Sequence, residues 1–139
     1  HLTKRKLFYR KERVRDAKEA IVYLCDKLIK KGLADENYKS DVMKRERISS
    51  TSFVQGFAVI HSIEITTSES CIATLTLSNP VQWGNFEVRL VILLAIREED
   101  NRLMSIFFDW LSNLVMDSQK LSALLSAKDQ NEFIRSILE

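Results

Sequence analysis

The sequence contains few of the residues that interrupt regular structure. Its 139 residues include three glycines and one proline, and such low numbers argue against long disordered or irregular segments. No apolar run approaches the ~20 residues that a membrane-spanning helix needs. The first residues do not have the pattern of a signal peptide. We therefore expect a cytoplasmic protein without membrane insertion.

A shortage of histidine and cysteine excludes several kinds of reactive site. His61 is the only histidine away from the terminus, so a site with several histidine ligands is excluded. Cys25 and Cys71 match no metal or redox spacing and fall on apolar faces, which predicts two reduced, buried thiols. The sequence also lacks a glycine-rich phosphate loop and a nucleophile elbow. A metal site that combines His61 with carboxylates stays open, although no recognisable spacing supports it.

Positive charge is concentrated at the beginning of the chain. Residues 1–15 contain seven lysines or arginines against Glu12 alone, whereas the whole chain has a formal net charge of +2. We expect a basic leader over 1–15 and one domain over 16–139, which is long enough to bury a substantial core. A solvated linker is the simpler interpretation of the leader, and contact with nucleic acid or an acidic neighbouring domain is the alternative. The apolar residues 7–9 could dock this leader on the domain.

Helical periodicity marks both halves of the chain. Apolar residues recur at helical spacing from Asp16 to Gly32, with Asp16 and Glu19 arranged as a capping box. A second helix is predicted over 35–46, followed by a loop over 48–52. Further helices are predicted over 103–115, over 118–127 and from Asp129 onward. The aromatic residues among them, Phe107, Phe108 and Trp110, are expected in the core.

The middle of the chain has the pattern of strands. Residues 56–60 are apolar on both alternating faces, which indicates a strand covered on both sides. Residues 71–77 and 87–96 are predicted to be two further strands, separated by a turn-rich segment around Pro80. The order of helices, strands and helices predicts an α/β fold of three layers, in which helices flank a central mixed sheet.

His61 ends the first predicted strand and is the main candidate for chemistry. Taken alone, such a histidine is more often structural than reactive. However, ligands in α/β sheets bind beyond strand ends, and hydroxyl residues and two arginines lie just upstream. A neutral imidazole can accept a phosphoryl group on one nitrogen, provided that a carbonyl or carboxylate holds the proton on the other. An arginine would stabilise the anionic group by charge-assisted hydrogen bonds.

Four segments together resemble a known family. Residues 45–62, RERISSTSFVQGFAVIHS, resemble the active-site stretch of mannitol/fructose-class enzyme IIA, a phosphoryl carrier of the bacterial phosphoenolpyruvate:sugar phosphotransferase system. The turn NPVQWGN, the strand RLVILLAI and the terminal AKDQNEFIRSILE are similar to later parts of the family pattern. The resemblance covers about 16–139 and implies the mannitol-type enzyme IIA fold.

The resemblance implies a function for three kinds of residue. His61 would accept a phosphoryl group from the carrier protein HPr, and Arg45 and Thr51 would stabilise it. Arg102 stands where members usually have a second active-site histidine, and it could donate to phosphate but not act as an acid or base. The transfer would need no metal and no cofactor.

Departures from the family pattern favour a regulatory protein. Ile60 replaces the family proline and Ser62 replaces the glycine after the histidine. Together with Arg102, they favour the enzyme IIA-like domain of a larger BglG-type antiterminator or activator, which would meet nucleic acid only through its other domains. A transport enzyme IIA that passes phosphoryl to an enzyme IIB is one alternative. A protein-interaction module with an unphosphorylated histidine is the other.

Overall fold

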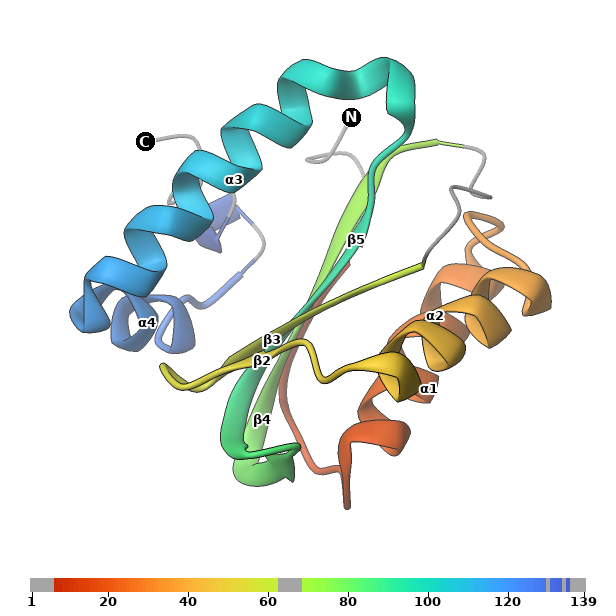
Figure 1. Ribbon diagram of the computed structural model, residues 1–139. Coiled ribbons are helices and arrows are strands. Elements are labelled where there is room, and N and C mark those ends of the chain that lie inside the picture. Colours follow the sequence, from red (N-terminus) through yellow and green to blue (C-terminus); the bar gives the residue numbers. More distant parts are fainter. Residues whose placement is uncertain (1–6, 63–68, 130, 134, 136–139) are drawn as a thin grey trace.

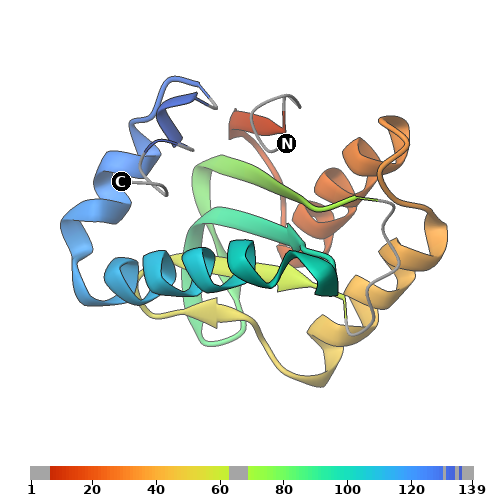
Figure 2. The same cartoon turned by 90° about the horizontal axis from the view of Figure 1, so that it is seen from above.

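A five-stranded mixed sheet forms the centre of the computed structural model, which describes residues 7–62, 69–129, 131–133 and 135. The strand order is β1-β4-β5-β3-β2 (Figures 1 and 2). β1 pairs with β4 and β3 with β5 in parallel, whereas β4–β5 and β2–β3 are antiparallel. The strands are β1 (Phe8–Glu12), β2 (Ser52–Phe53), β3 (Phe57–His61), β4 (Cys71–Trp83) and β5 (Phe86–Ala95).

Helices cover both faces of this sheet. On one side lie α1 (Ala17–Lys30) and α2 (Glu36–Ile48). The 3-10 helix η2 (Glu98–Asp100) leads into α3 (Asn101–Met116), which lies with α4 (Ser118–Leu125) on the other side (Figure 1). The predicted three-layer α/β fold with a mixed sheet is confirmed. None of the described helices combines the length and hydropathy needed to cross a membrane.

The alternating side chains of β3 divide the core into two clusters. Ala58 and Ile60 pack with α1 and α2, whereas Phe57 and Val59 pack with α3 and α4. This arrangement confirms that the strand is covered on both faces. The two cysteines lie in the first cluster as buried thiols that form no disulfide with each other, as the sequence predicts.

The first two helices begin at the predicted caps. The Asp16 carboxylate accepts the Glu19 amide proton at 2.9 Å, and the Asp35 carboxylate accepts that of Tyr38 at 2.9 Å. The Glu19 carboxylate completes the first cap by accepting from the Arg15 amide at 3.1 Å. α2 extends two residues beyond its predicted end, to Ile48, so the predicted loop of 48–52 is shorter than expected.

The leader and the turn-rich segment differ from the sequence predictions. Residues 7–9 dock on the domain as predicted, but Phe8 and Tyr9 do so as part of the edge strand β1, and Leu7, just before the strand, is only 1% exposed. Charged side chains are common on such an edge strand and limit its pairing with other chains. β4 continues through the exposed Pro80 to Trp83. Proline has no backbone N–H to donate to a neighbouring strand, and it is tolerated here because the β4–β5 pairing is irregular between Thr76 and Val81.

The chain beyond α4 is described only in part. The Asp129 carboxylate accepts the Glu132 amide proton at 2.9 Å, as a predicted capping residue should. Phe133 is buried against Trp110 and Phe8. The predicted burial of Ile134, Ile137 and Leu138 falls outside the described residues.

Candidate functional site

A cavity of about 650 Å³ opens where β3 and β5 end. Because these strands are parallel, their carboxyl ends meet at one edge of the sheet, with His61 beside Leu94. The end of α2, the segment after it and one face of α3 complete the cavity walls. Three of the four predicted site residues line it: Arg45, Thr51 and His61.

The ring of His61 is held by the main chain. Its Nδ1 atom lies 3.1 Å from the carbonyl oxygen of Ser62. A carbonyl oxygen only accepts hydrogen bonds, so Nδ1 carries the proton and Nε2 keeps a lone pair. No described residue makes a hydrogen bond to Nε2. This hydrogen bond favours the tautomer in which Nε2 can act as a nucleophile.

Arg45 reaches the cavity from the last turn of α2. Its Nη1 atom donates to the carbonyl oxygen of Ser49 at 2.9 Å. No described carboxylate lies within ion-pair distance of its guanidinium. Because a guanidinium has five N–H donors, Arg45 keeps donors and a full positive charge for an anion in the cavity.

Thr51 is hydrogen-bonded to Glu46, a residue for which no role was predicted from the sequence. Thr51 donates its hydroxyl proton to Glu46 Oε1 at 2.6 Å and its amide proton to Oε2 at 2.8 Å. Trp83 Nε1 also donates to Oε2, at 2.9 Å. The single hydroxyl proton of Thr51 is therefore directed at Glu46 and away from the cavity. The arginine–glutamate pair followed by threonine was the only sequence signal for this cluster.

The segment that follows α2 also contacts the β4–β5 turn. Ser52 donates its hydroxyl proton to the carbonyl oxygen of Trp83 at 2.7 Å, and the hydroxyl oxygens of Ser50 and Ser52 are 2.9 Å apart. Gly84 in the turn has a φ of +63°, and a Cβ atom there would lie 2.7 Å from Ser50 Oγ. Residues 50–52 and the β4–β5 turn are therefore packed together without space for a side chain at position 84.

Arg102 is not with the other predicted site residues. It is exposed on the first turn of α3 and does not line the cavity. The structure therefore brings together Arg45, Thr51 and His61, and leaves Arg102 at the surface.

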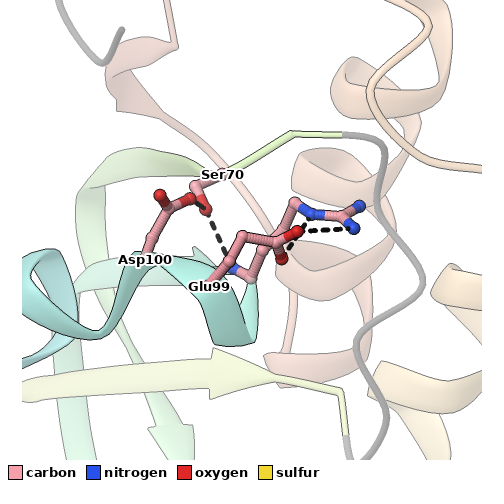
Figure 3. A network of polar contacts seen from close by, with 4 residues as sticks. Ser70, Glu99 and Asp100 are labelled. Carbon is pink, nitrogen blue, oxygen red and sulfur yellow. Dashed lines mark hydrogen bonds and ion pairs between the residues drawn. The ribbon is translucent and has the colours of Figure 1, made fainter.

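A polar network fixes the connection from β5 into α3 (Figure 3). Ser70, just before β4, donates its hydroxyl proton to the Asp100 carboxylate and accepts the amide proton of Arg97 at 2.8 Å. The Arg97 guanidinium donates to Glu99 at 2.8 and 3.1 Å. These bonds lower the pKa of Glu99. The network joins the beginning of β4 to the helix that forms the apolar wall of the cavity.

That apolar wall contains one aromatic residue that the sequence analysis placed in the core. Met104, Phe108 and Leu111 line the cavity from one face of α3. Phe107 and Trp110 are buried as predicted, at 0% and 4% exposure, but Phe108 is 53% exposed. The prediction for Phe108 was wrong because two faces of α3 have different surroundings. Phe107 and Trp110 lie on the face that packs in the core, whereas Phe108 lies on an adjacent face that lines the cavity. No cluster of metal-ligating side chains occurs within the described part of the chain.

The fold and the site define a three-layer α/β domain in which a histidine at the carboxyl end of an inner strand shares a cavity with an arginine, at the sheet edge where α/β proteins bind their ligands. Residues 1–139 match the family described as "Phosphoenolpyruvate-dependent sugar phosphotransferase system, EIIA 2". The chain therefore belongs to the type 2 enzyme IIA family of the phosphotransferase system.

Relatives include both regulators and a phosphotransferase component. The transcriptional regulator ManR of Bacillus subtilis is 36% identical over 94 residues, which are 68% of this chain and 14% of the regulator. The Probable licABCH operon regulator of the same organism is 26% identical over 129 residues, 93% of this chain and 20% of that protein. The mannitol-specific phosphotransferase enzyme IIA component of Halalkalibacterium halodurans is 27% identical over 130 residues, 89% of this chain and 86% of the component. The chain thus spans a fifth or less of the two regulators.

Solved structures share the fold. Enzyme IIAMTL in its complex with phosphorylated enzyme IIBMTL, from Escherichia coli, has a TM-score of 0.77 at 19% identity, covering 94% of this chain and 93% of that chain. The crystal structure of IIA mannitol from Escherichia coli has a TM-score of 0.74 at 19% identity, covering 94% and 95%. The mannitol-type enzyme IIA fold is therefore confirmed.

Proposed function

We propose that His61 accepts a phosphoryl group from the phosphohistidine of HPr, in the regulatory domain of a sugar-responsive transcriptional antiterminator or activator. The observation that carries the proposal is the hydrogen bond between His61 Nδ1 and the Ser62 carbonyl. It leaves Nε2 as the nucleophilic nitrogen, at a cavity that also contains Arg45. We expect this chemistry to take place in the cytoplasm.

The transfer exchanges one phosphorus–nitrogen bond for another. The Nε2 lone pair attacks the phosphorus atom, a new P–N bond forms, and the P–N bond to the donor histidine breaks. The donor ring keeps the electron pair of that bond. His61 retains its Nδ1 proton, which becomes more acidic in the phosphorylated ring and is stabilised by the Ser62 carbonyl. Arg45 would stabilise the phosphoryl oxygens by charge-assisted hydrogen bonds.

Similarity to the two regulators supports the regulatory assignment over transport. The position of Arg102 also favours it, since the family resemblance places a second histidine there and an arginine cannot exchange protons near neutral pH. The transport alternative draws its support from the similarity to the mannitol-specific component and to the IIA–IIB complex. An interaction module without phosphorylation is the third possibility.

Phosphorylation is tested with phosphoenolpyruvate, enzyme I and HPr. We expect the intact mass to increase by one phosphoryl group, in an acid-labile form, and His61→Ala to abolish the increase. Ser62→Ala is the matched control, because the Nδ1 bond uses the main chain and survives it. If wild type and His61→Ala behave alike, His61 is not the acceptor, and an unmodified wild type favours the interaction module.

A second measurement separates regulation from transport. Phosphorylated protein is mixed with enzyme IIB domains of the mannitol and fructose classes, and loss of phosphoryl is followed with time. We expect slow loss, comparable to hydrolysis in buffer. Rapid transfer to one enzyme IIB would overturn the regulatory assignment in favour of transport.

A further inference from the structure

Glu46 is the most heavily hydrogen-bonded side chain near the cavity, although it does not line the cavity. Its carboxylate accepts three hydrogen bonds, from the amide and hydroxyl of Thr51 and from the indole of Trp83. All three distances are 2.9 Å or shorter. An ionised carboxylate is an acceptor only and has room for several donors, so its hydrogen-bonding geometry matches this cluster.

These bonds fix the path of the chain between α2 and β2. Both donors of Thr51 point to Glu46, and Trp83 holds the carboxylate from β4. The short segment between Ile48 and Ser52 is therefore held beneath the last turn of α2. Ser49 belongs to this segment, and its carbonyl oxygen accepts the hydrogen bond from Arg45 Nη1.

A chain of contacts thus joins Glu46 to the arginine at the cavity. The carboxylate places Thr51, the segment places the Ser49 carbonyl, and this carbonyl orients the guanidinium. Resting on the function proposed above, we infer that Glu46 is the positioning residue for Arg45, and that it speeds phosphoryl uptake without touching the phosphoryl group. A long arginine side chain has many conformations, and one fixed carbonyl partner reduces them before the donor arrives.

The inference predicts a rate effect that depends on Arg45. Glu46→Gln keeps the size of the side chain but replaces one carboxylate oxygen by an NH2 group, which donates hydrogen bonds and does not accept them. The variant therefore cannot accept all three hydrogen bonds. We expect kcat for phosphoryl uptake from phospho-HPr to fall at least about 10-fold, with KM within about 2-fold because Glu46 is outside the cavity. Glu36→Gln is the matched control, since it makes the same change on the exposed first turn of α2. The control should leave both constants unchanged.

A double-mutant cycle separates positioning from general damage. If Glu46 acts through Arg45, the pair Arg45→Ala/Glu46→Gln is no slower than Arg45→Ala alone, within about 2-fold. The inference would be overturned if the rate losses of the two single variants multiplied in the double variant. An unchanged kcat in Glu46→Gln would also overturn it. Thr51→Val removes the hydroxyl donor to Glu46 and should resemble Glu46→Gln. All rates are measured at a temperature at which every variant is folded.

A measurement without phosphoryl transfer distinguishes this inference from the proposed function. Nitrogen-15 NMR of the arginine side chains reports how fast each guanidinium rotates, and Arg45→Ala identifies the Arg45 signals. We expect slow rotation of Arg45 in wild type and Glu36→Gln, and fast rotation in Glu46→Gln. Unchanged signals in Glu46→Gln would overturn the positioning role. If wild type takes up no phosphoryl group, the proposed function fails, and this NMR result alone decides the role of Glu46.

Discussion

The Nδ1 atom of His61 bonds to the carbonyl oxygen of Ser62, its own neighbour in the chain, at 3.1 Å. The acceptor belongs to the main chain, so the bond does not depend on the side chain at position 62. The replacement of the family glycine by Ser62 therefore leaves the histidine orientation in place.

The His61–Ser62 bond predicts the tautomer of the neutral ring. We expect nitrogen-15 NMR to show a protonated Nδ1 and a lone pair on Nε2, whereas free histidine prefers its proton on Nε2. Ser62→Ala should give the same pattern. A ring protonated on Nε2 would contradict the arrangement and remove the nucleophile from the proposed transfer.

Arg45→Ala should slow phosphoryl uptake and leave the fold intact. Loss of one preorganised donor to a developing charge costs about 100-fold in rate. Because Arg45 makes one hydrogen bond to an exposed segment, the free energy of unfolding should change by less than about 1 kcal/mol. Arg47→Ala, an exposed arginine on the same turn, is the control. Rapid kinetics and urea unfolding check the two effects, and lost stability with normal uptake would make Arg45 structural.

The buried Cys25 predicts a loss of stability in alkali. Burial raises the pKa of its thiol from 9.0 to about 12. The folded state therefore holds the proton more tightly than the unfolded chain. Stability is unaffected well below pH 9 and falls as the pH rises from 9 toward 12. Between pH 8 and 10 the loss from this group should be about 1 kcal/mol.

Urea unfolding of wild type and Cys25→Ala under reducing conditions tests this pH dependence. The buried Tyr38 also has a raised pKa, mainly because of its burial and to a smaller extent because of Cys25, and most of this effect is common to both proteins. The difference in free energy of unfolding between wild type and Cys25→Ala should therefore shrink by about 1 kcal/mol between pH 8 and 10. Parallel pH profiles would show that Cys25 does not titrate as expected.

Two adjacent phenylalanines predict opposite mutational effects. Phe107 is 0% exposed and Phe108 is 53% exposed. Phe107→Ala should lower the free energy of unfolding by about 3–5 kcal/mol, whereas Phe108→Ala should lower it by less than about 1 kcal/mol. Urea unfolding of the two variants is the measurement, and each serves as the control for the other. Equal losses would contradict the assignment of Phe108 to the cavity wall.

Most of the fold was predictable because its helices and inner strands have regular apolar periods. Asp16 and Asp35 fixed the helix beginnings, and the run from Phe57 to Ile60 identified a strand covered on both faces. β1 was not predicted, since the charged side chains of an edge strand hide its period. The extension of β4 through Pro80 was also missed, because proline is tolerated only where the ladder is irregular, and this irregularity has no sequence signal.

The family resemblance singled out Arg45, Thr51 and His61, and the structure places these three residues around one cavity. Their hydrogen bonds could not be predicted. Sequence spacing cannot show which acceptor takes the proton of Thr51, because this depends on the fold of the segment after α2. The position of Arg102 likewise depends on where α3 begins relative to the cavity, and the structure places it at the surface.

Gly84 gives the β4–β5 turn a significance beyond closing a hairpin. Its positive φ excludes most residues on conformational grounds, and the contact with Ser50 excludes the rest by volume. A side chain there would push directly on a hydroxyl residue of the cavity lining. Sequence drift at this turn is therefore restricted by the cavity lining, and a substitution in the loop would change the shape of the candidate site.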